Sequence, residues 1–90
     1  IVSALGAVFE PISDNDKKKL SLENGLKVSK LSAGKLLSAG IREGFIITHI
    51  DHKKVNSVED VKAAVENKKN GILIEGVYPN GMRAYYGFGL

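Results

Sequence analysis

Short apolar stretches, separated by turn residues, form the main pattern along the chain. The apolar run over residues 5–10 ends at Pro11, which favours a strand. Residues 26–31 alternate between apolar and polar side chains, as a half-buried strand does, and residues 45–50 are β-rich. Two further strands, at 72–78 and 82–88, flank Pro79-Asn80-Gly81 and are predicted to form a hairpin.

Three segments between these strands carry helix signals. Residues 13–16 offer N-cap candidates for a short helix that ends in lysines. Ser32 can cap a second short helix over 33–39, and Gly40 follows it where a left-handed C-cap is favoured. The longest helix is predicted over 58–67 with Ser57 as its N-cap, and its apolar face consists of Val58, Val61, Ala64 and Val65. Strands mixed with short helices in this order indicate an α+β fold.

The apolar positions of these periodic segments also predict the core. Because one face of each strand and helix must be covered, the following residues are expected inside: Val28, Ile41, Ile46, Ile50, Val55, Val61, Ala64, Ile72 and Ile74.

Composition restricts the function classes that need to be considered. Ninety residues make a single domain, residues 1–90, and 43% apolar with 26% charged residues argues against disorder. The net charge of +3 and the few aromatic residues argue against a nucleic-acid partner. Without cysteine there is no disulfide or thiolate chemistry, and no apolar run approaches the ~18 residues of a membrane span. Since the chain opens with Ile1, it is expected to be a fragment of a longer protein.

No motif indicates a catalytic, metal or cofactor site. His49 and His52 frame Asp51, but these positions point in different directions and no third ligand accompanies them, so a solvated pair is favoured over a metal site. No serine lies in a Gly-x-Ser-x-Gly motif, and Gly34-Lys35 lacks the other residues of a phosphate-binding loop. No catalytic residue, metal or cofactor is therefore predicted.

A groove for an extended peptide is the remaining candidate site. A strand that begins in a glycine-containing turn, beside an amphipathic helix, can accept a peptide as an added strand on a free sheet edge. Consecutive backbone N–H groups near residues 4–7 could hold the terminal carboxylate of that peptide. In the alternative interpretation, Leu5, Ala7 and Phe9 are core residues and Gly6 only permits a turn. The residues alone leave both open.

Five stretches resemble a family in order and spacing. Leu5-Gly6-Ala7 is similar to a Leu-Gly-Val loop, residues 25–31 to a G-v-x-V-x-x-V strand, and residues 38–47 to A-A-G-L-x-x-G-D-x-I. Residues 50–55 are similar to I-N-G-x-x-V and residues 57–61 to S-x-x-D-L. Together they resemble the circularly permuted PDZ domain of bacterial HtrA/Deg serine proteases. The chain departs from this pattern at Phe45, where the family has a turn-stabilising aspartate, and at Ala7, where a larger apolar residue is common.

The resemblance implies a fold and a binding site. The fold would be a small antiparallel partial β-barrel of five or six strands capped by two helices. Backbone N–H groups of Leu5, Gly6 and Ala7 would receive a carboxylate, and Val8 and Phe9 would pair with the peptide. Val65 would line the terminal pocket with Leu5 and Ala7, while Val58 and Lys62 would lie along the helix side. A small apolar terminal residue should suit this pocket, and Lys62 should favour an acidic residue upstream.

The resemblance also implies a context. Partners would be peptides or unfolded protein segments with a free C-terminal carboxylate, together with other PDZ or protease domains of the same assembly. The piece would be a non-catalytic part of a serine protease for protein quality control in the periplasm or cell envelope. The alternative is an oligomerisation or regulatory element of the same protease, with a vestigial or partner-occupied groove.

Overall fold

The computed structural model describes residues 2–4, 6–66 and 71–89, with only the backbone for residues 2–4, 35, 65, 66 and 88. Its strands and helices, in chain order, are β1 (Val2–Ala4), β2 (Ala7–Pro11), α1 (Asp14–Leu20), β3 (Leu26–Leu31), α2 (Lys35–Ser38), β4 (Ile46–Ile50), β5 (Lys53–Lys54), α3 (Val58–Glu66), β6 (Gly71–Val77) and β7 (Arg83–Gly89).

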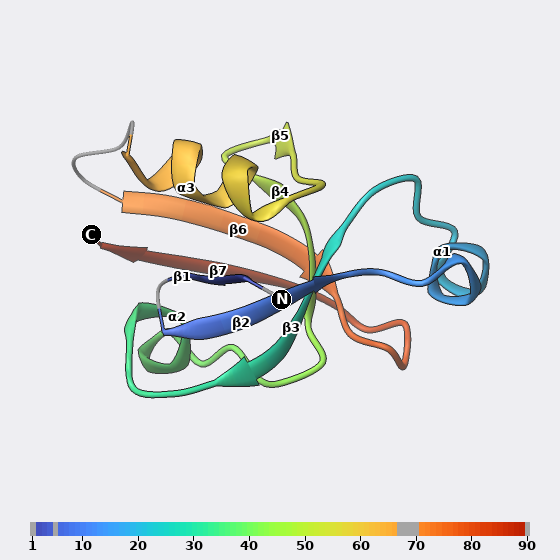
Figure 1. The fold of residues 1–90 in the computed structure, drawn as a ribbon, viewed down its shortest axis with the longest axis horizontal. Helices are drawn as coiled ribbons and strands as arrows, with labels where there is room; N and C mark the ends of the chain where they lie inside the picture. Colours follow the sequence, from blue (N-terminus) through green and yellow to red (C-terminus); the bar gives the residue numbers. More distant parts are fainter. Residues whose placement is uncertain (1, 5, 67–70, 90) are drawn as a thin grey trace.

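One curved antiparallel sheet organises the described part of the chain (Figure 1). The strands follow the order β1-β2-β3-β4-β6-β7, and the two-residue β5 pairs with β4. Since β1 and β7 are the outer strands and do not pair with each other, the sheet is an open, partial barrel. The predicted α+β class is confirmed; β1 and the short β5 are additional to the strands that the pattern predicts.

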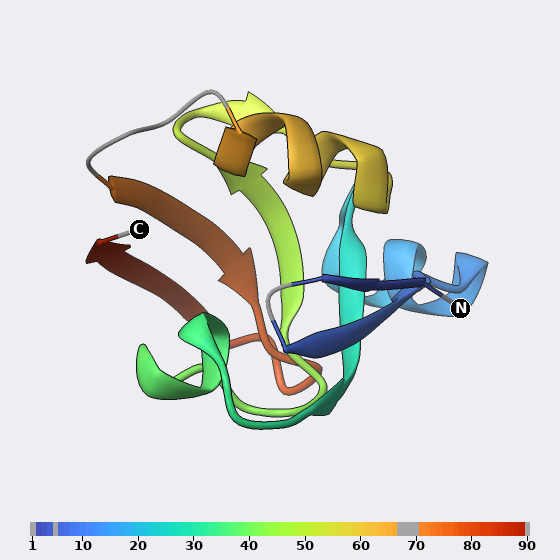
Figure 2. The same ribbon diagram turned by 60° about the vertical axis from the view of Figure 1, so that its left-hand side comes forward.

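Helix α3 lies across the concave side of the sheet, beside β1 (Figure 2). A capping box fixes its first turn: the Ser57 hydroxyl accepts from the Asp60 amide, and the Asp60 carboxylate accepts from the Asn56 and Ser57 amides. Val58 and Val61 are buried on the face towards the sheet. The predicted cap and apolar face therefore position this helix over the sheet.

The main core lies between the concave side of the sheet and helices α2 and α3. Leu36 of α2 and Val61 of α3 are both buried in this cluster. The predicted core residues are buried, with the exception of Ala64, which is half-buried at the edge of the cluster. Helix α2 is shorter than predicted, because it begins only at Lys35.

Phe45 is fully buried, although its position was interpreted as the loss of a turn-stabilising carboxylate. Its ring packs against Tyr78 at 4.8 Å between centroids and edge-on against Tyr86 at 5.3 Å. The Tyr78 and Tyr86 hydroxyls share a hydrogen bond, and the Arg42 amide donates to the Tyr78 oxygen. An aromatic cluster thus holds the turn before β4.

Helix α1 and the segment after it cover one end of the opposite face. Ser13, one of the four predicted cap candidates, caps α1 by accepting from the Asp16 amide, and Leu20 packs against a small cluster that contains Ile46. In the same segment Asn24 is buried, and its side-chain amide donates to the Thr48 and Val55 carbonyls at 2.7 and 3.1 Å. Among the described residues, no helix is both long and apolar enough to cross a lipid bilayer.

Candidate groove between β2 and α3

A hairpin at the start of the chain covers the outer edge of β2. Strand β1 pairs antiparallel with β2 in the register Val2↔Phe9, Ser3↔Val8 and Ala4↔Ala7. Two residues connect the strands, and the second, Gly6, has a φ of 79°. A glycine adopts this left-handed conformation without the steric penalty of a side chain.

The connection is anchored on the segment after β3. The carbonyl oxygen of Gly6 accepts from the Ser32 amide at 2.8 Å and from the Ser32 hydroxyl at 3.0 Å. In a trans peptide the carbonyl and the following N–H point in opposite directions. Since the Gly6 carbonyl is directed at Ser32, the Ala7 N–H is directed to the other side, towards the outer edge of β2.

The edge of β2 and helix α3 form the two walls of a groove. Strand β1 lies between β2, with which it pairs, and α3, which it contacts (Figure 2). Beyond Val2 the groove continues as a hollow of about 220 Å³, which Phe9 and Val58 line from opposite walls. The remaining lining residues are Glu10, Pro11, Leu26, Asn56, Ser57 and Glu59.

Comparison with known proteins identifies the fold. No family model matches the chain, and no curated protein matches its sequence. Among solved structures, the chain is similar to the HtrA3 PDZ domain bound to a phage-derived ligand, FGRWV, with a TM-score of 0.77. The chain has the fold of an HtrA-type PDZ domain. The likeness covers 96% of this chain and 82% of that structure at 16% sequence identity, so it concerns the fold.

The PDZ fold brings several of the predicted site residues to the groove. Ala7 and Phe9 of β2 are 2% and 1% exposed and belong to the main core, as the alternative interpretation of these positions held. They can offer the groove their main chain, and Phe9 also lines the hollow together with Val58. Val8 is half-buried, and its carbonyl accepts from the Ser29 hydroxyl on the β3 side at 3.0 Å.

Three predicted site residues add less to this picture. Lys62 is exposed on α3, one turn after the buried Val58. Leu5 lies outside the described residues, and so does the side chain of Val65. The position of the terminal pocket that these two residues were predicted to line therefore stays a prediction.

Two features of the groove differ from the sequence-based interpretation. The outer edge of β2 is not free, because β1 pairs with it. Ser32 does not cap α2, because that helix begins three residues later; its amide and hydroxyl bind Gly6 instead. The first feature has one weak sequence signal, since a glycine at position 6 can supply the positive φ of a turn.

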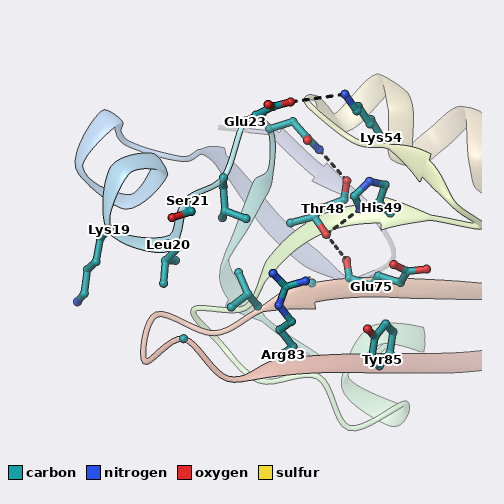
Figure 3. A pocket seen from close by; sticks show the side chains of 15 residues that line it. Lys19, Leu20, Ser21, Glu23, Thr48, His49, Lys54, Glu75, Arg83 and Tyr85 are labelled. Atoms are coloured by element: carbon teal, nitrogen blue, oxygen red, sulfur yellow. Dashed lines mark hydrogen bonds and ion pairs between the residues drawn. The ribbon is translucent and has the colours of Figure 1, made fainter.

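A second hollow, of about 430 Å³, lies on the opposite face, between the end of α1 and strands β4, β6 and β7 (Figure 3). Charges of both signs line it, and two of them, Lys54 and Glu23, form an exposed ion pair at 3.7 Å. The Thr48 hydroxyl donates to the Glu75 carbonyl at 3.2 Å and lies 3.0 Å from His49 Nδ1. Because these lining groups are already paired with each other, we favour the groove over this hollow as the ligand site.

The two histidines lie in different surroundings. His49 is half-buried in β4 and contacts Thr48, whereas His52 is exposed in the following turn, with its Nδ1 3.1 Å from the Glu75 carboxylate. Among the described residues no group of three or more histidine or acidic side chains could hold a metal ion.

Proposed function

We propose that this PDZ domain is a peptide-binding module that takes C-terminal or extended apolar segments of other polypeptides as an added strand on β2. The observation that carries the proposal is the β1–β2 pairing beside α3. This pairing supports the proposal because it places a three-residue antiparallel strand on the edge of β2, in the groove beside α3. Main-chain pairing of this kind gives affinity without requiring a fixed ligand sequence.

The direction of β1 supports recognition of a chain end. Strand β1 runs towards Gly6, so a peptide in the same direction would end at the glycine connection. There the Ala7 N–H is directed to the groove side, because Ser32 holds the preceding carbonyl. A terminal carboxylate at this point would accept charge-assisted hydrogen bonds, which are about twice as strong as neutral ones.

The hollow beyond Val2 would receive upstream residues of the ligand. It lies next to Glu10 and Pro11, which follow Phe9 along β2, and Glu59 approaches it from α3. We expect these two carboxylates to favour a basic residue there, whereas exposed Lys62 favours an acidic residue nearer the terminus.

The structural neighbour supports the peptide as the ligand class, since that HtrA3 PDZ domain is bound to a five-residue phage-derived peptide. No step of the proposed function requires catalysis by this domain. We also propose that the module serves an HtrA/Deg-type envelope protease and presents misfolded proteins to it. This context is supported by the motifs at residues 5–7, 38–47 and 57–61.

A titration tests the proposal. The peptide FGRWV, as free acid and as C-terminal amide, is added to ¹⁵N-labelled protein and followed by amide chemical shifts. We expect the free acid to shift residues 6–9 and 58–62 and the amide to bind several-fold more weakly. Unchanged shifts in both segments with both peptides at millimolar concentration would contradict peptide binding.

A substitution in the second hollow gives the control. Tyr85 is exposed on the face away from the groove, at the wall of the second hollow. Tyr85→Ala should leave the titration unchanged if the ligand binds beside β2. Loss of binding in Tyr85→Ala would move the ligand site to the opposite face.

A further inference from the structure

We infer that β1 is a built-in occupant of the groove, which a ligand peptide must displace; this regulation rests on the proposed peptide-binding function. Strand β1 uses the outer edge of β2, and it lies beside α3. It also runs in the direction that a C-terminal peptide would take, with Ala4 nearest to the glycine connection. The same main-chain groups therefore cannot serve β1 and a ligand at once.

The attachment of β1 is suited to exchange. The strand has three residues and ends the sheet, and among the described strands it pairs only with β2. Short edge strands with few partners belong to the parts of a protein that open most readily. By contrast, β2 has a second neighbour in β3, so it keeps its place in the sheet when β1 leaves.

A ligand offers one group that β1 cannot. Ala4 continues into the chain, so its carbonyl is a neutral amide carbonyl, whereas a peptide terminus is a charged carboxylate. Because hydrogen bonds to a charged acceptor are about twice as strong, a free chain end can replace β1 although both offer the same main-chain pairing. An internal segment lacks this advantage, and the occupied groove therefore selects for chain ends.

Occupancy by β1 lowers the apparent affinity of every ligand. If the groove is open in a fraction f of the molecules, the apparent dissociation constant rises by 1/f. A groove open in about one molecule of ten thus binds about tenfold more weakly than a permanently open one. Conditions that pull residues 2–4 away from β2 would activate the groove.

The register of β1 on β2 allows an engineered disulfide that holds the two strands together reversibly. The Val8 carbonyl is directed at Ser29 of β3, so Val8 uses its main-chain groups on that side. In an antiparallel ladder such a residue forms a closely spaced pair with its partner on the other side, here Ser3, with Cα atoms about 4.5 Å apart. A disulfide accepts this separation, and the chain has no other cysteine to compete.

The experiment compares the oxidised and reduced forms of the double variant Ser3→Cys, Val8→Cys, each titrated with free-acid FGRWV. We expect oxidation to weaken binding at least tenfold, because β1 is then fixed on β2. Equal affinity of the two forms would overturn the inference while the proposed function stands. Binding in neither form, and none in the unsubstituted protein, would overturn the proposed function as well. Oxidation that yields only disulfide-linked dimers would place β1 on another copy of the chain and overturn an intramolecular lock.

A variant with the opposite effect completes the test. By the same alternation, Val2 exchanges main-chain hydrogen bonds with Phe9, and proline at this position removes the N–H donor. We expect Val2→Pro to bind FGRWV several-fold more tightly than the unsubstituted protein. Weaker or unchanged binding in Val2→Pro would contradict a β1 that competes with the ligand.

Discussion

The ring of Phe45 occupies the space that a side chain at Gly76 would need. A Cβ atom built on Gly76 would lie 2.5 Å from Cζ of Phe45 and would also collide with the Ile46 carbonyl oxygen. The missing side chain in β6 thus makes room for the aromatic ring that closes the turn before β4. This pairing accounts for a large apolar residue at a position where the motif that the sequence resembles has aspartate.

Phe45→Asp should destabilise the domain although it restores the aspartate of the motif that residues 38–47 resemble. The carboxylate would be enclosed between Tyr78 and Tyr86 in a fully buried position. Burying a charge without a partner is costly, and we expect a loss of about 3 kcal/mol or more in urea denaturation. Phe45→Leu, which keeps an apolar side chain, should lose clearly less. A Phe45→Asp variant as stable as the Phe45→Leu variant would contradict this account.

Gly6→Ala should lose more stability than Gly81→Ala. Both glycines have left-handed φ angles, 79° and 89°, which cost a non-glycine residue about 1–2 kcal/mol. Only at Gly6 would the new Cβ also meet a backbone oxygen, that of Ala33, at 2.8 Å, whereas nothing lies within 4 Å at Gly81. Denaturation curves measure the difference. Equal losses would mean that the glycine connection is not held tightly against residues 33 and 34.

Val61→Ala should destabilise the domain, and Lys62→Ala should not. Val61 is 1% exposed in the main core, whereas the neighbouring Lys62 is exposed. Removing two buried methyl groups costs about 1–3 kcal/mol through lost burial and the cavity that remains. Thermal melting of both variants provides the measurement. A comparable decrease in melting temperature for both would show that α3 presents a different face to the sheet.

Stability should decline between pH 10 and pH 12 because of Tyr86. Burial, and then the hydrogen bond to the Tyr78 hydroxyl, raise the pKa of Tyr86 to about 12 from its ordinary value of 10.0. The unfolded chain therefore loses this proton first, so the contribution of Tyr86 is complete below pH 10 and disappears as the pH rises through 12. Tyr86→Phe should melt lower than the unsubstituted protein at pH 8 and differ less from it at pH 11.5. A constant difference across this range would exclude the titration of Tyr86 as the cause.

Local patterns were sufficient for most of the fold. Ser57 was identified as a cap, and Ser13 was among four candidates, because a cap depends only on residues within one helical turn. The strands at 26–31 and 72–77 follow from alternation and β propensity, which are also local properties. The burial of the apolar positions in these strands was predicted with them, since each strand packs its apolar face against the core.

The remaining features depend on contacts between distant residues. Phe45 fits because residue 76 is a glycine, and no pattern near residue 45 contains that information. Strand β1 is too short for a hydrophobic period, so its pairing with β2 could not be recognised by alternation. Ser32 was a plausible helix cap by residue type. Instead, its amide and its hydroxyl both donate to the carbonyl of Gly6, which lies 26 residues earlier in the chain. The groove between β2 and α3 stays a prediction, and it was made without strand β1, which pairs with β2 there.

The buried amide of Asn24 has a kinetic consequence. It joins two carbonyls, on Thr48 and Val55, which are 24 and 31 positions further along the chain. Such bonds form only after the intervening loop has closed, so we expect them to form late in folding. Interactions that are absent from the transition state raise the barrier to unfolding and leave the folding rate nearly unchanged. We therefore expect Asn24 to govern how long a folded molecule persists rather than how quickly it forms.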